Sequence, residues 1–485
     1  MIEQTIFDLL YPKYKIDKPI RLITLFSGYD SQALALKYLG VKFEHWKTCE
    51  WAVKSIQALN DLHFQDYNDY SASFDIDYIK EWLLKKGISN NWNEPMQENQ
   101  IKRMSEEYAR KIFNNIIATR NLVNIQQVKG SDLEIKDTNK YCYILTYSFP
   151  CQDLSLAGKG KGMSDTSTRS GLLWEVERIL TELEEKPQML LMENVPQVHS
   201  EDNKEDFKKW ILRLEELGYK NYWQDLIATD YGIPQTRNRC FMVSLLGNYS
   251  YAFPPKQELK IRLKDLLEDN VDEKYYISDK MLECFMSEGT GSYPRKERFL
   301  QNINRKNQDI ANSLTTLEGS RPTCTFIKIK NATKKGYLEG TEGDGVDISS
   351  RMQYHRGTVQ KGKIQTITTS GGENLGVIVN KPRVIGGIGE KDSNNNTQWK
   401  QQNRVYDDNL SISITTSYNP FYKNDLRIRK LTPRECFRLM GVKDKDFNKI
   451  KKNQSDSSLY HLAGDSIVVN VLMAIFKEFL EEKNG

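Results

Sequence analysis

An alternation of strand-like runs with helical segments constrains the fold more than any other feature of this sequence. Strand-like runs, several of them strongly apolar, cover residues 20–26, 43–49, 141–145, 189–192, 222–228 and 240–246. Segments with helical spacing lie between several of them, at residues 33–39, 171–183 and 204–217. Strands that alternate with helices predict an α/β fold around a mostly parallel sheet.

Three of these runs lead to a side chain that can act as a nucleophile or an acid. The run at 141–145 leads to Pro150 and Cys151, and the runs at 43–49 and 189–192 lead to Glu50 and Glu193. Ligands of open α/β sheets bind outside the carboxyl ends of the strands. The glycine- and lysine-rich segment after Cys151 adds exposure and positive charge, which favour a thiolate. A buried structural cysteine and solvent-facing glutamates are the alternative interpretation.

The first strand, turn and helix are typical of a nucleotide-binding unit. Ser27 and Gly28 form a tight turn before a helix, whose N-terminus favours an anionic group. Glu50, about twenty residues further on, suits a pair of ribose hydroxyls. Trp51 could cover a purine face, and Asp132 could accept the amine of an adenine ring. Each of these residues alone is equally compatible with an ordinary turn or helix start.

The later strands carry groups suited to acid–base chemistry. A partly desolvated Glu193 would have a raised pKa and could hold a proton at neutral pH. Arg237 and Arg239 lie two residues apart on an extended segment, so their side chains point to the same face. This pair suits an anionic or carbonyl-rich ligand, and two surface arginines are the alternative.

Composition narrows the class of protein without fixing it. The chain has 485 residues, a net charge of +4 and seven unevenly spaced cysteines. Its length predicts two or three domains, and its cysteines form neither a disulfide framework nor the Cys/His spacing of a zinc site. We expect an intracellular protein with no membrane span and no metal, because no signal peptide and no run of eighteen apolar residues occur.

The chain divides into three regions by composition. Residues 1–247 form the predicted catalytic and cofactor-binding domain, with a helical insertion at about 61–129. Residues 248–426 are rich in Gly, Asn, Thr and Ser and form a smaller β-rich domain. Residues 427–485 return to the first domain, where Thr432 starts a helix and residues 443–458 read as a polar loop.

The middle region contains three similar short segments about fifty residues apart. They share a [Leu/Ile]-Thr-Thr core whose threonines are Thr315, Thr316, Thr368, Thr369, Thr415 and Thr416. We interpret them as three copies of one short β unit. The abundant polar side chains of this region fit contacts to phosphates and base edges. The alternative is that the Thr-Thr pair recurs by chance in a β-rich accessory domain.

Taken together, these motifs resemble the cytosine-C5 DNA methyltransferases, over about residues 20–245 and 427–480. In chain order the matching segments are Phe26-Ser27-Gly28, Glu50-Trp51, Asp132-Leu133, Pro150-Cys151-Gln152, Glu193-Asn194-Val195, Gln235 with Arg237 and Arg239, Arg429–Glu435, and Gly464-Asp465-Ser466. Each motif alone is common, but together they follow the family's order around a variable region. The sequence departs from the family at Thr24 and Asp30 in the first turn and at Asp465 in the last motif.

The resemblance implies a Rossmann-like S-adenosylmethionine-dependent methyltransferase domain plus a target recognition domain at residues 248–426. It implies that Cys151 adds to C6 of a flipped-out cytosine, that Glu193 binds its N3 and amine, and that Arg239, supported by Arg237, binds O2. It further implies that the cofactor contacts are Phe26, Ser27, Gly28, Glu50, Trp51, Asp132, Leu133, Pro150, Asp465 and Ser466.

The implied substrate is double-stranded DNA, and a loop at 155–168 would close over the flipped base. The predicted DNA contacts are Gln152, Ser155, Lys159, Lys161, Gln235 and the six threonines of the repeats. We expect a cytoplasmic monomer, of bacterial or phage origin, with a separately encoded restriction endonuclease as partner. An RNA cytosine methyltransferase and a catalytically inactive DNA-binding regulator are the alternatives.

Overall fold

The computed structural model describes residues 11–150, 170–269, 271–287, 295–303, 309–330, 345–347, 359–360, 375–377, 384–391, 397–406 and 426–480. The chain forms two compact units. The first comprises Met1–Val271, Arg298–Thr325 and Leu431–Gly485, and the second comprises Asp272–Glu297 and Phe326–Lys430. Residues 248–271 and 298–325 therefore pack with the first unit, although the sequence analysis placed them in the β-rich middle region.

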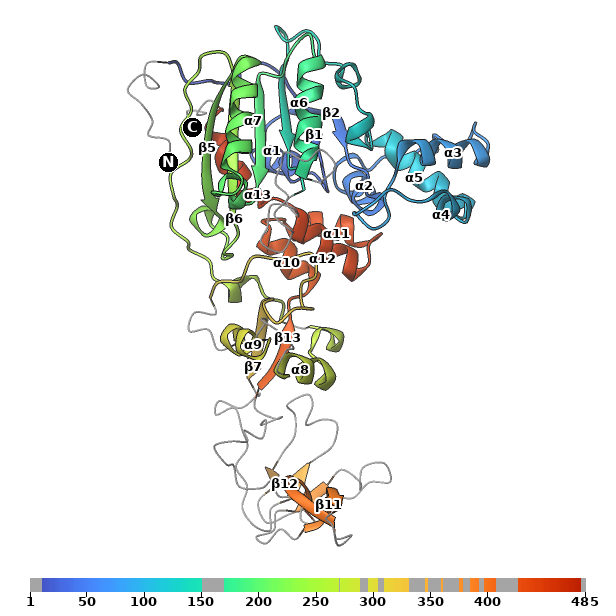
Figure 1. The fold of residues 1–485 in the computed structure, drawn as a ribbon, viewed down its shortest axis with the longest axis vertical. Coiled ribbons are helices and arrows are strands. Elements are labelled where there is room, and N and C mark those ends of the chain that lie inside the picture. Colours follow the sequence, from blue (N-terminus) through green and yellow to red (C-terminus); the bar gives the residue numbers. More distant parts are fainter. Residues whose placement is uncertain are drawn as a thin grey trace. The chain divides into compact units, whose positions relative to one another are not determined.

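The first unit contains a six-stranded sheet in the order β2-β1-β3-β4-β6-β5 (Figure 1). The strands are β1 (Ile20–Leu25), β2 (Phe43–Cys49), β3 (Cys142–Tyr147), β4 (Met189–Asn194), β5 (Tyr219–Ile227) and β6 (Asn238–Leu246). β1 to β4 pair in parallel, and β6 runs antiparallel to both of its neighbours. The predicted α/β fold with a mostly parallel sheet is thus confirmed. The carboxyl ends of β1 to β4 meet at one edge, which positions the site.

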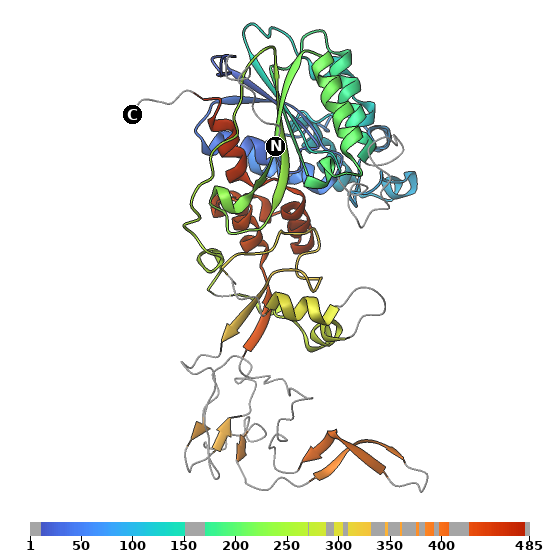
Figure 2. The same cartoon turned by 60° about the vertical axis from the view of Figure 1, so that its left-hand side comes forward.

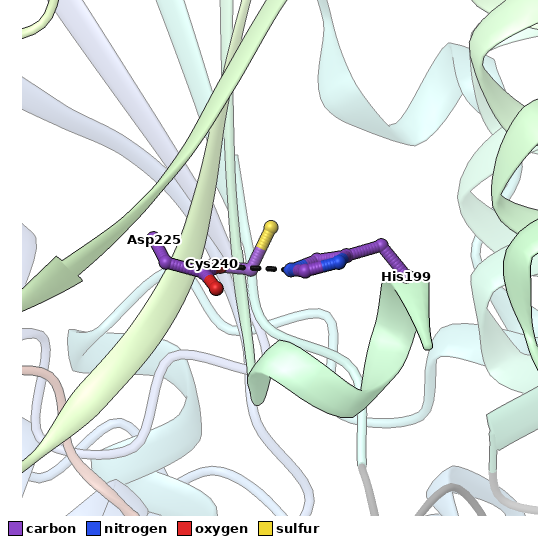
Figure 3. A group of neighbouring side chains, drawn as sticks. All are labelled: His199, Asp225 and Cys240. Atoms are coloured by element: carbon purple, nitrogen blue, oxygen red, sulfur yellow. Dashed lines mark hydrogen bonds and ion pairs between the residues drawn. The ribbon is translucent and has the colours of Figure 1, made fainter. Parts of the chain in front are cut away.

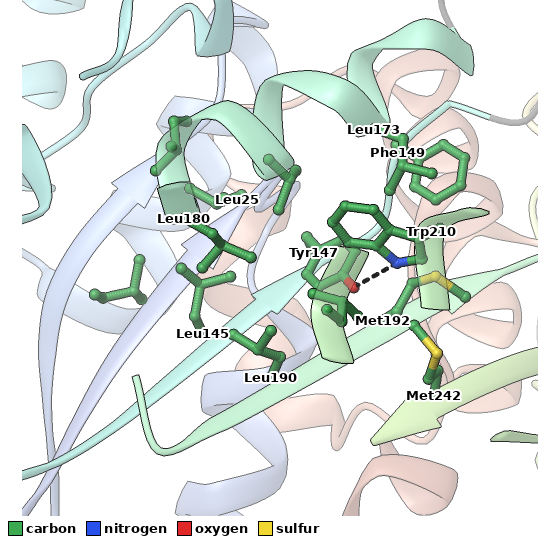
Figure 4. Close-up of a cluster of buried hydrophobic side chains, with 14 of the residues drawn as sticks. Leu25, Leu145, Tyr147, Phe149, Leu173, Leu180, Leu190, Met192, Trp210 and Met242 are labelled. Atoms are coloured by element: carbon green, nitrogen blue, oxygen red, sulfur yellow. Dashed lines mark hydrogen bonds between the residues drawn. The ribbon is translucent and has the colours of Figure 1, made fainter. Parts of the chain in front are cut away.

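Helices cover both faces of this sheet. α6 (Leu173–Glu182) and α7 (Lys204–Glu216) lie on one face, and the red helix α13 (Val469–Lys477) lies on the opposite side (Figure 2). α13 packs against α1 (Ser31–Tyr38). The core under α6 and α7 joins strand residues to helix residues, and Trp210 Nε1 donates to the Tyr147 hydroxyl at 3.2 Å (Figure 4). Burial of each such large side chain stabilises the folded state by about 1.5–3 kcal/mol. A well-packed layer therefore supports the ends of the strands.

The insertion between β2 and β3 is helical, with its own core. Its helices are α3 (Ile76–Lys86), α4 (Glu98–Lys102) and α5 (Glu106–Ala118), and they follow α2 (Val53–Leu59). α4 and α5 are separate helices, because Ser105 starts a new helix after α4 ends. The Ser105 side chain accepts a hydrogen bond from the Tyr108 N–H, which is the geometry of an N-cap.

The return segment is more helical than the sequence indicated. α10 (Pro433–Leu439) has the expected capping box, in which Thr432 and Glu435 exchange hydrogen bonds. The expectation of a polar loop at 443–458 is wrong, because this stretch contains α11 (Asp444–Lys451) and the start of α12 (Asp456–Asp465). Phe447 and Ile450 form one buried helical stripe among the lysines. Over the described residues, Asp456–Lys477 is the run long and apolar enough for a membrane span, but 67% of its most apolar window is buried in the fold.

The second unit contains short strands and small sheets. β8 (Gly345–Asp347), β9 (Val359–Gln360) and β10 (Leu375–Val377) form one sheet, β11 (Val384–Lys391) and β12 (Thr397–Tyr406) a second, and β7 (Phe326–Lys330) and β13 (Leu426–Lys430) a third. α8 (Asp279–Met286) belongs to this unit, and α9 (Arg295–Ile303) crosses the boundary into the first. The first Thr-Thr copy, at 311–316, makes only an isolated bridge from Ala311 to Gln235, not a strand. The other two copies lie outside the described residues.

Candidate active site

The turn after β1 brings a backbone N–H to the acid that follows β2. The Ser27 N–H donates to the Cys49 carbonyl (3.1 Å), and the Cys49 N–H donates to Ser27 Oγ (3.2 Å). This exchange lets the Gly28 N–H donate to one Glu50 oxygen (2.9 Å), while the Ala52 N–H donates to the other (2.7 Å). The carboxylate is therefore held in a fixed direction at the sheet edge.

The backbone around Gly28 leaves room for a ligand. Phe26 and Gly28 have φ angles of 57° and 55°, in the left-handed region that favours glycine. A Cβ atom placed on Gly28 would meet no heavy atom within 4 Å. Burial raises the pKa of Glu50 to about 7, although the Ala52 and Gly28 N–H groups lower it and the Asp465 charge raises it further.

Thr24 and Asp30, the two departures in this turn, form a buried pair beneath it. Asp30 caps α1 by accepting the Ala33 N–H at 2.9 Å, and the Thr24 hydroxyl donates to its other oxygen at 3.3 Å. Burial alone would raise the pKa of Asp30, but His45 and His63 hold it below its usual value. This acid therefore supports the turn from below, and the N-terminus of α1 is already capped.

The other predicted adenine contacts have local partners in the structure. Trp51 packs partly buried against the core of the insertion. Asp132 lies in a short 3-10 turn and accepts the Lys129 N–H at 2.9 Å. Leu133 is buried, and its carbonyl accepts the indole N–H of Trp46 at 2.8 Å. These contacts show what holds the three residues and leave their cofactor role a prediction.

The closing segment at the end of α12 is tied to the first turn. The Tyr29 hydroxyl donates to Ser466 Oγ at 2.9 Å, which joins Gly28's neighbour to the predicted last motif. Sequence reasoning assigned no role to Tyr29, and the only available signal was its position directly after Gly28. Asp465 remains exposed and pairs with His461 through Nε2 and Oδ2 at 2.9 Å.

The buried Glu193 pairs with the partly exposed Arg239 where β4 ends and β6 begins. Arg239 Nε lies 3.1 Å from Glu193 Oε1, and Glu193 is 7% exposed. Burial raises the pKa of Glu193, while Arg239 and Arg237 oppose the shift and Asp465 adds to it. A carboxyl group in this position can hold a proton and donate a hydrogen bond.

Arg237 is buried and binds the backbone of two other segments. Its guanidinium donates to the carbonyls of Leu314 (3.2 Å), Gly464 (2.9 Å) and Ser466 (2.8 Å). Burial, together with the charge of Arg239, lowers its pKa to about 9. These bonds anchor Arg237 inside the first unit, and its support of Arg239 in binding a base remains a prediction.

The strand that leads to Cys151 is tied to the strand of Glu193. The Asn194 side-chain amide donates to the Phe149 carbonyl at 3.0 Å, and Pro150 follows it half-buried. Asn194 had no assigned role in the sequence, although it follows Glu193 directly. Cys151 itself and the predicted DNA contacts Gln152, Ser155, Lys159, Lys161, Thr368, Thr369, Thr415 and Thr416 lie outside the described residues.

Three residues expected to contact DNA lie inside the first unit instead. Gln235 is fully buried, donates to the Leu439 carbonyl (2.7 Å) and accepts the Leu314 N–H (3.1 Å), so it presents no surface to DNA. Thr315 and Thr316 are half-buried, and their backbone packs against Gly464. A Cβ on Gly464 would lie 2.5 Å from the Thr315 carbonyl carbon.

One group of possible metal ligands occurs among the described residues, on the face of the sheet under α7. His199, Asp225 and Cys240 bring their ligand atoms within 4.8 Å of one another (Figure 3). His199 Nε2 and Asp225 Oδ1 are 2.9 Å apart, so each already has a partner in the protein. Burial, followed by the charge of Asp225, raises the pKa of the Cys240 thiol well above its usual value. The trio is therefore adequately explained as a hydrogen-bonded cluster.

Comparison with known protein families decides the identity. A model of the family described as C-5 cytosine-specific DNA methylase matches residues 84–481. The chain belongs to this family. It is a DNA (cytosine-5-)-methyltransferase, and the Glu193–Arg239 pair lies within the matched part of the methylase.

Relatives of this methylase include type II and orphan methyltransferases. It is 28% identical to the type II methyltransferase M2.ScrFI of Lactococcus lactis subsp. cremoris over 469 residues, covering 96% of this chain and 100% of the relative. It is 38% identical to the orphan methyltransferase M.SssI of Spiroplasma monobiae over 271 residues, covering 53% and 67%. The crystal structure of the S. pombe Dnmt2 methyltransferase aligns with a TM-score of 0.52 and 15% identity, covering 96% and 99%, which supports the fold.

Proposed function

We propose that this methylase transfers a methyl group from S-adenosylmethionine to C5 of a cytosine flipped out of duplex DNA, through a covalent adduct between Cys151 and C6. The observation that carries the proposal is the pairing of buried Glu193 with Arg239, 3.1 Å apart, at the sheet edge where β3 ends and Phe149 follows. A target base that is still paired cannot reach this edge, so it must leave the stack.

The residues at the first turn fit the methyl donor. Gly28 leaves open space beside a carboxylate that two backbone N–H groups hold in place. Glu50 would accept the two ribose hydroxyls, Trp51 and Asp132 would contact the adenine, and Asp465 and Ser466 would close the pocket. When bound, S-adenosylmethionine supplies an activated methyl group.

The protein side chains make the cytosine reactive. The Cys151 thiolate forms a bond to C6, and the displaced electron pair makes C5 nucleophilic. Glu193 hydrogen-bonds N3 and the exocyclic amine, which stabilises the charge that develops on the ring. Arg239 binds O2 and the neighbouring backbone, and Arg237 supports it. After methylation, a base removes the C5 proton, and the returning electron pair expels Cys151.

The test is the Cys151→Ala variant. Methyl transfer to DNA should fall below detection while binding to duplex DNA and to S-adenosylmethionine persists, because only the covalent step is lost. Cys284→Ala, which removes an exposed cysteine of the second unit, is the matched control and should retain activity. Transfer of a tritiated methyl group measures the reaction, fluorescence anisotropy measures DNA binding, and isothermal titration calorimetry measures S-adenosylmethionine binding. Normal transfer by Cys151→Ala would refute the covalent mechanism.

We also propose that residues 248–426 set the DNA sequence preference. The support is the polar composition of this region, rich in Gly, Asn, Thr and Ser, together with the small sheets that β7 to β13 form. Exchanging this region with that of a relative of different specificity should exchange the methylated site. Bisulfite sequencing of host DNA reads the result, and an unchanged site would contradict the assignment.

A further inference from the structure

The loop after α3 returns the helical insertion to the residues that follow Glu50. Gly87 ends α3 with a φ of 68°. Ser89 then donates its N–H to the Trp51 carbonyl (2.8 Å) and accepts the Val53 N–H (2.9 Å). The insertion therefore contacts the segment directly after the acid that ends β2.

Trp92, in this loop, is held in a strained backbone conformation. Its φ is 61°, which bulky residues adopt only where their surroundings fix them. Its indole N–H donates to Ser55 Oγ on α2 at 3.1 Å. Its ring lies on the imidazole of His461, with the ring centroids 3.7 Å apart and the planes at 32°. Two independent contacts thus fix this side chain across from α12.

His461 in turn lies beside the exposed acid at the end of α12, within ion-pairing distance. His461 Nε2 lies 2.9 Å from Asp465 Oδ2, one helical turn further on. The Asp465 side chain is 57% exposed, whereas that of His461 is 21% exposed. A carboxylate this exposed can turn into water unless a partner restrains it. The Trp92 ring packs on the imidazole that lies 2.9 Å from this carboxylate.

The charge of Asp465 acts on both ends of the active site. Gly464 and Ser466 flank Asp465 and accept hydrogen bonds from Arg237 at 2.9 and 2.8 Å, and the Asp465 charge raises the pKa of Glu50 and of Glu193. The neighbouring Ser466 is bound to Tyr29 beside the first turn. The direction of the Asp465 carboxylate therefore changes the electrostatic potential where the methyl donor is proposed to bind.

We propose that Trp92 is a positioning residue that acts through His461 on Asp465, and that the insertion thereby sets the affinity of the pocket for a cationic methyl donor. This inference rests on the proposed function. S-adenosylmethionine carries a sulfonium charge that S-adenosylhomocysteine lacks. A correctly directed carboxylate therefore favours the first ligand more than the second.

A double-mutant cycle on the full chain tests the link. Isothermal titration calorimetry would measure the Kd of S-adenosylmethionine and S-adenosylhomocysteine for the wild type, W92A, D465N and W92A/D465N. We expect W92A to weaken S-adenosylmethionine binding about fivefold and S-adenosylhomocysteine binding less, with no further loss in the D465N background, because coupled residues are non-additive. His461→Gln should behave like W92A.

Controls separate this effect from simple loss of packing. Trp92→Phe keeps the stack and should bind nearly as well as the wild type, and Tyr78→Ala removes an exposed aromatic of α3 without contacting α12. Unchanged S-adenosylmethionine binding by W92A, or the same loss in both Asp465 and D465N backgrounds, overturns the inference. If W92A does not fold, His461→Gln alone decides by the same criterion. Failure of the wild type to bind S-adenosylmethionine overturns the proposed function instead.

Discussion

Glu50 and Glu193 lie at the carboxyl ends of two parallel strands of one sheet, yet the protein holds them by different means. Burial raises the pKa of both, and Asp465 adds to both shifts. Glu50 accepts two backbone N–H groups, at 2.9 and 2.7 Å. Glu193 instead faces a guanidinium, with Arg239 Nε at 3.1 Å.

The different partners of Glu50 and Glu193 show how one edge of a sheet can support two chemical tasks. Backbone N–H groups fix the direction of a carboxylate but bring no counter-charge, so Glu50 keeps lone pairs for the two ribose hydroxyls proposed to bind it. A guanidinium compensates the charge of Glu193 and leaves an acid that can share a proton with a substrate ring. Under the proposed function, Glu50 therefore serves to bind the methyl donor, and Glu193 serves to stabilise charge on the base during the reaction.

Of the variants that distinguish the two acids, Glu193→Gln should have the largest effect, and that effect should be on kcat. The amide keeps the shape of the side chain but cannot hold or exchange a proton, and it leaves Arg239 without its partner. We expect kcat to fall by about 10²–10⁴-fold, the usual range for removing a general acid, with little change in S-adenosylmethionine affinity. Single-turnover methyl transfer at saturating ligands measures the rate.

A surface glutamate provides the matched control for that experiment. Glu201 pairs with Lys204 on the protein surface, where its side chain is 87% exposed, and Glu201→Gln should leave the rate unchanged. If Glu193→Gln turned over at the wild-type rate, Glu193 would be only a structural partner of Arg239.

The sequence predicted the local parts of this arrangement well. β2 begins and ends at the expected residues, and Thr432 caps α10 as expected, because strand composition and capping chemistry are encoded within a few positions. The polar stretch at 443–458 was misjudged because only Phe447 and Ile450 form the buried stripe of α11 within its lysine-rich sequence. Sparse apolar spacing gives too weak a periodic signal.

The long-range parts of the site could not be read from the sequence. Gln235 was expected at DNA, but its amide bonds to Leu439 and Leu314, both far away in the chain. Tyr29 reaches Ser466 across 437 positions, and no local pattern specifies that contact. Motif order located Glu193 and Arg239 correctly at one edge, whereas their pairing with each other depends on the antiparallel register of β4 and β6.

The Glu50→Gln variant should have a smaller effect, on the affinity for S-adenosylmethionine and on the pH dependence of that affinity. Glu50 has a pKa raised to about 7, so the carboxylate that accepts ligand hydroxyls forms as the pH rises through about 7. The affinity of the wild type for S-adenosylmethionine should therefore increase from about pH 6 to about pH 8. Glu50→Gln should bind about tenfold more weakly at the higher pH, the free-energy equivalent of roughly one lost hydrogen bond to a charged group, and should show no such pH dependence. Calorimetric titrations at several pH values measure both effects.

Glu193→Gln should retain the pH dependence of donor binding, and its loss in that variant would show that the two acids titrate as one coupled pair rather than performing separate tasks.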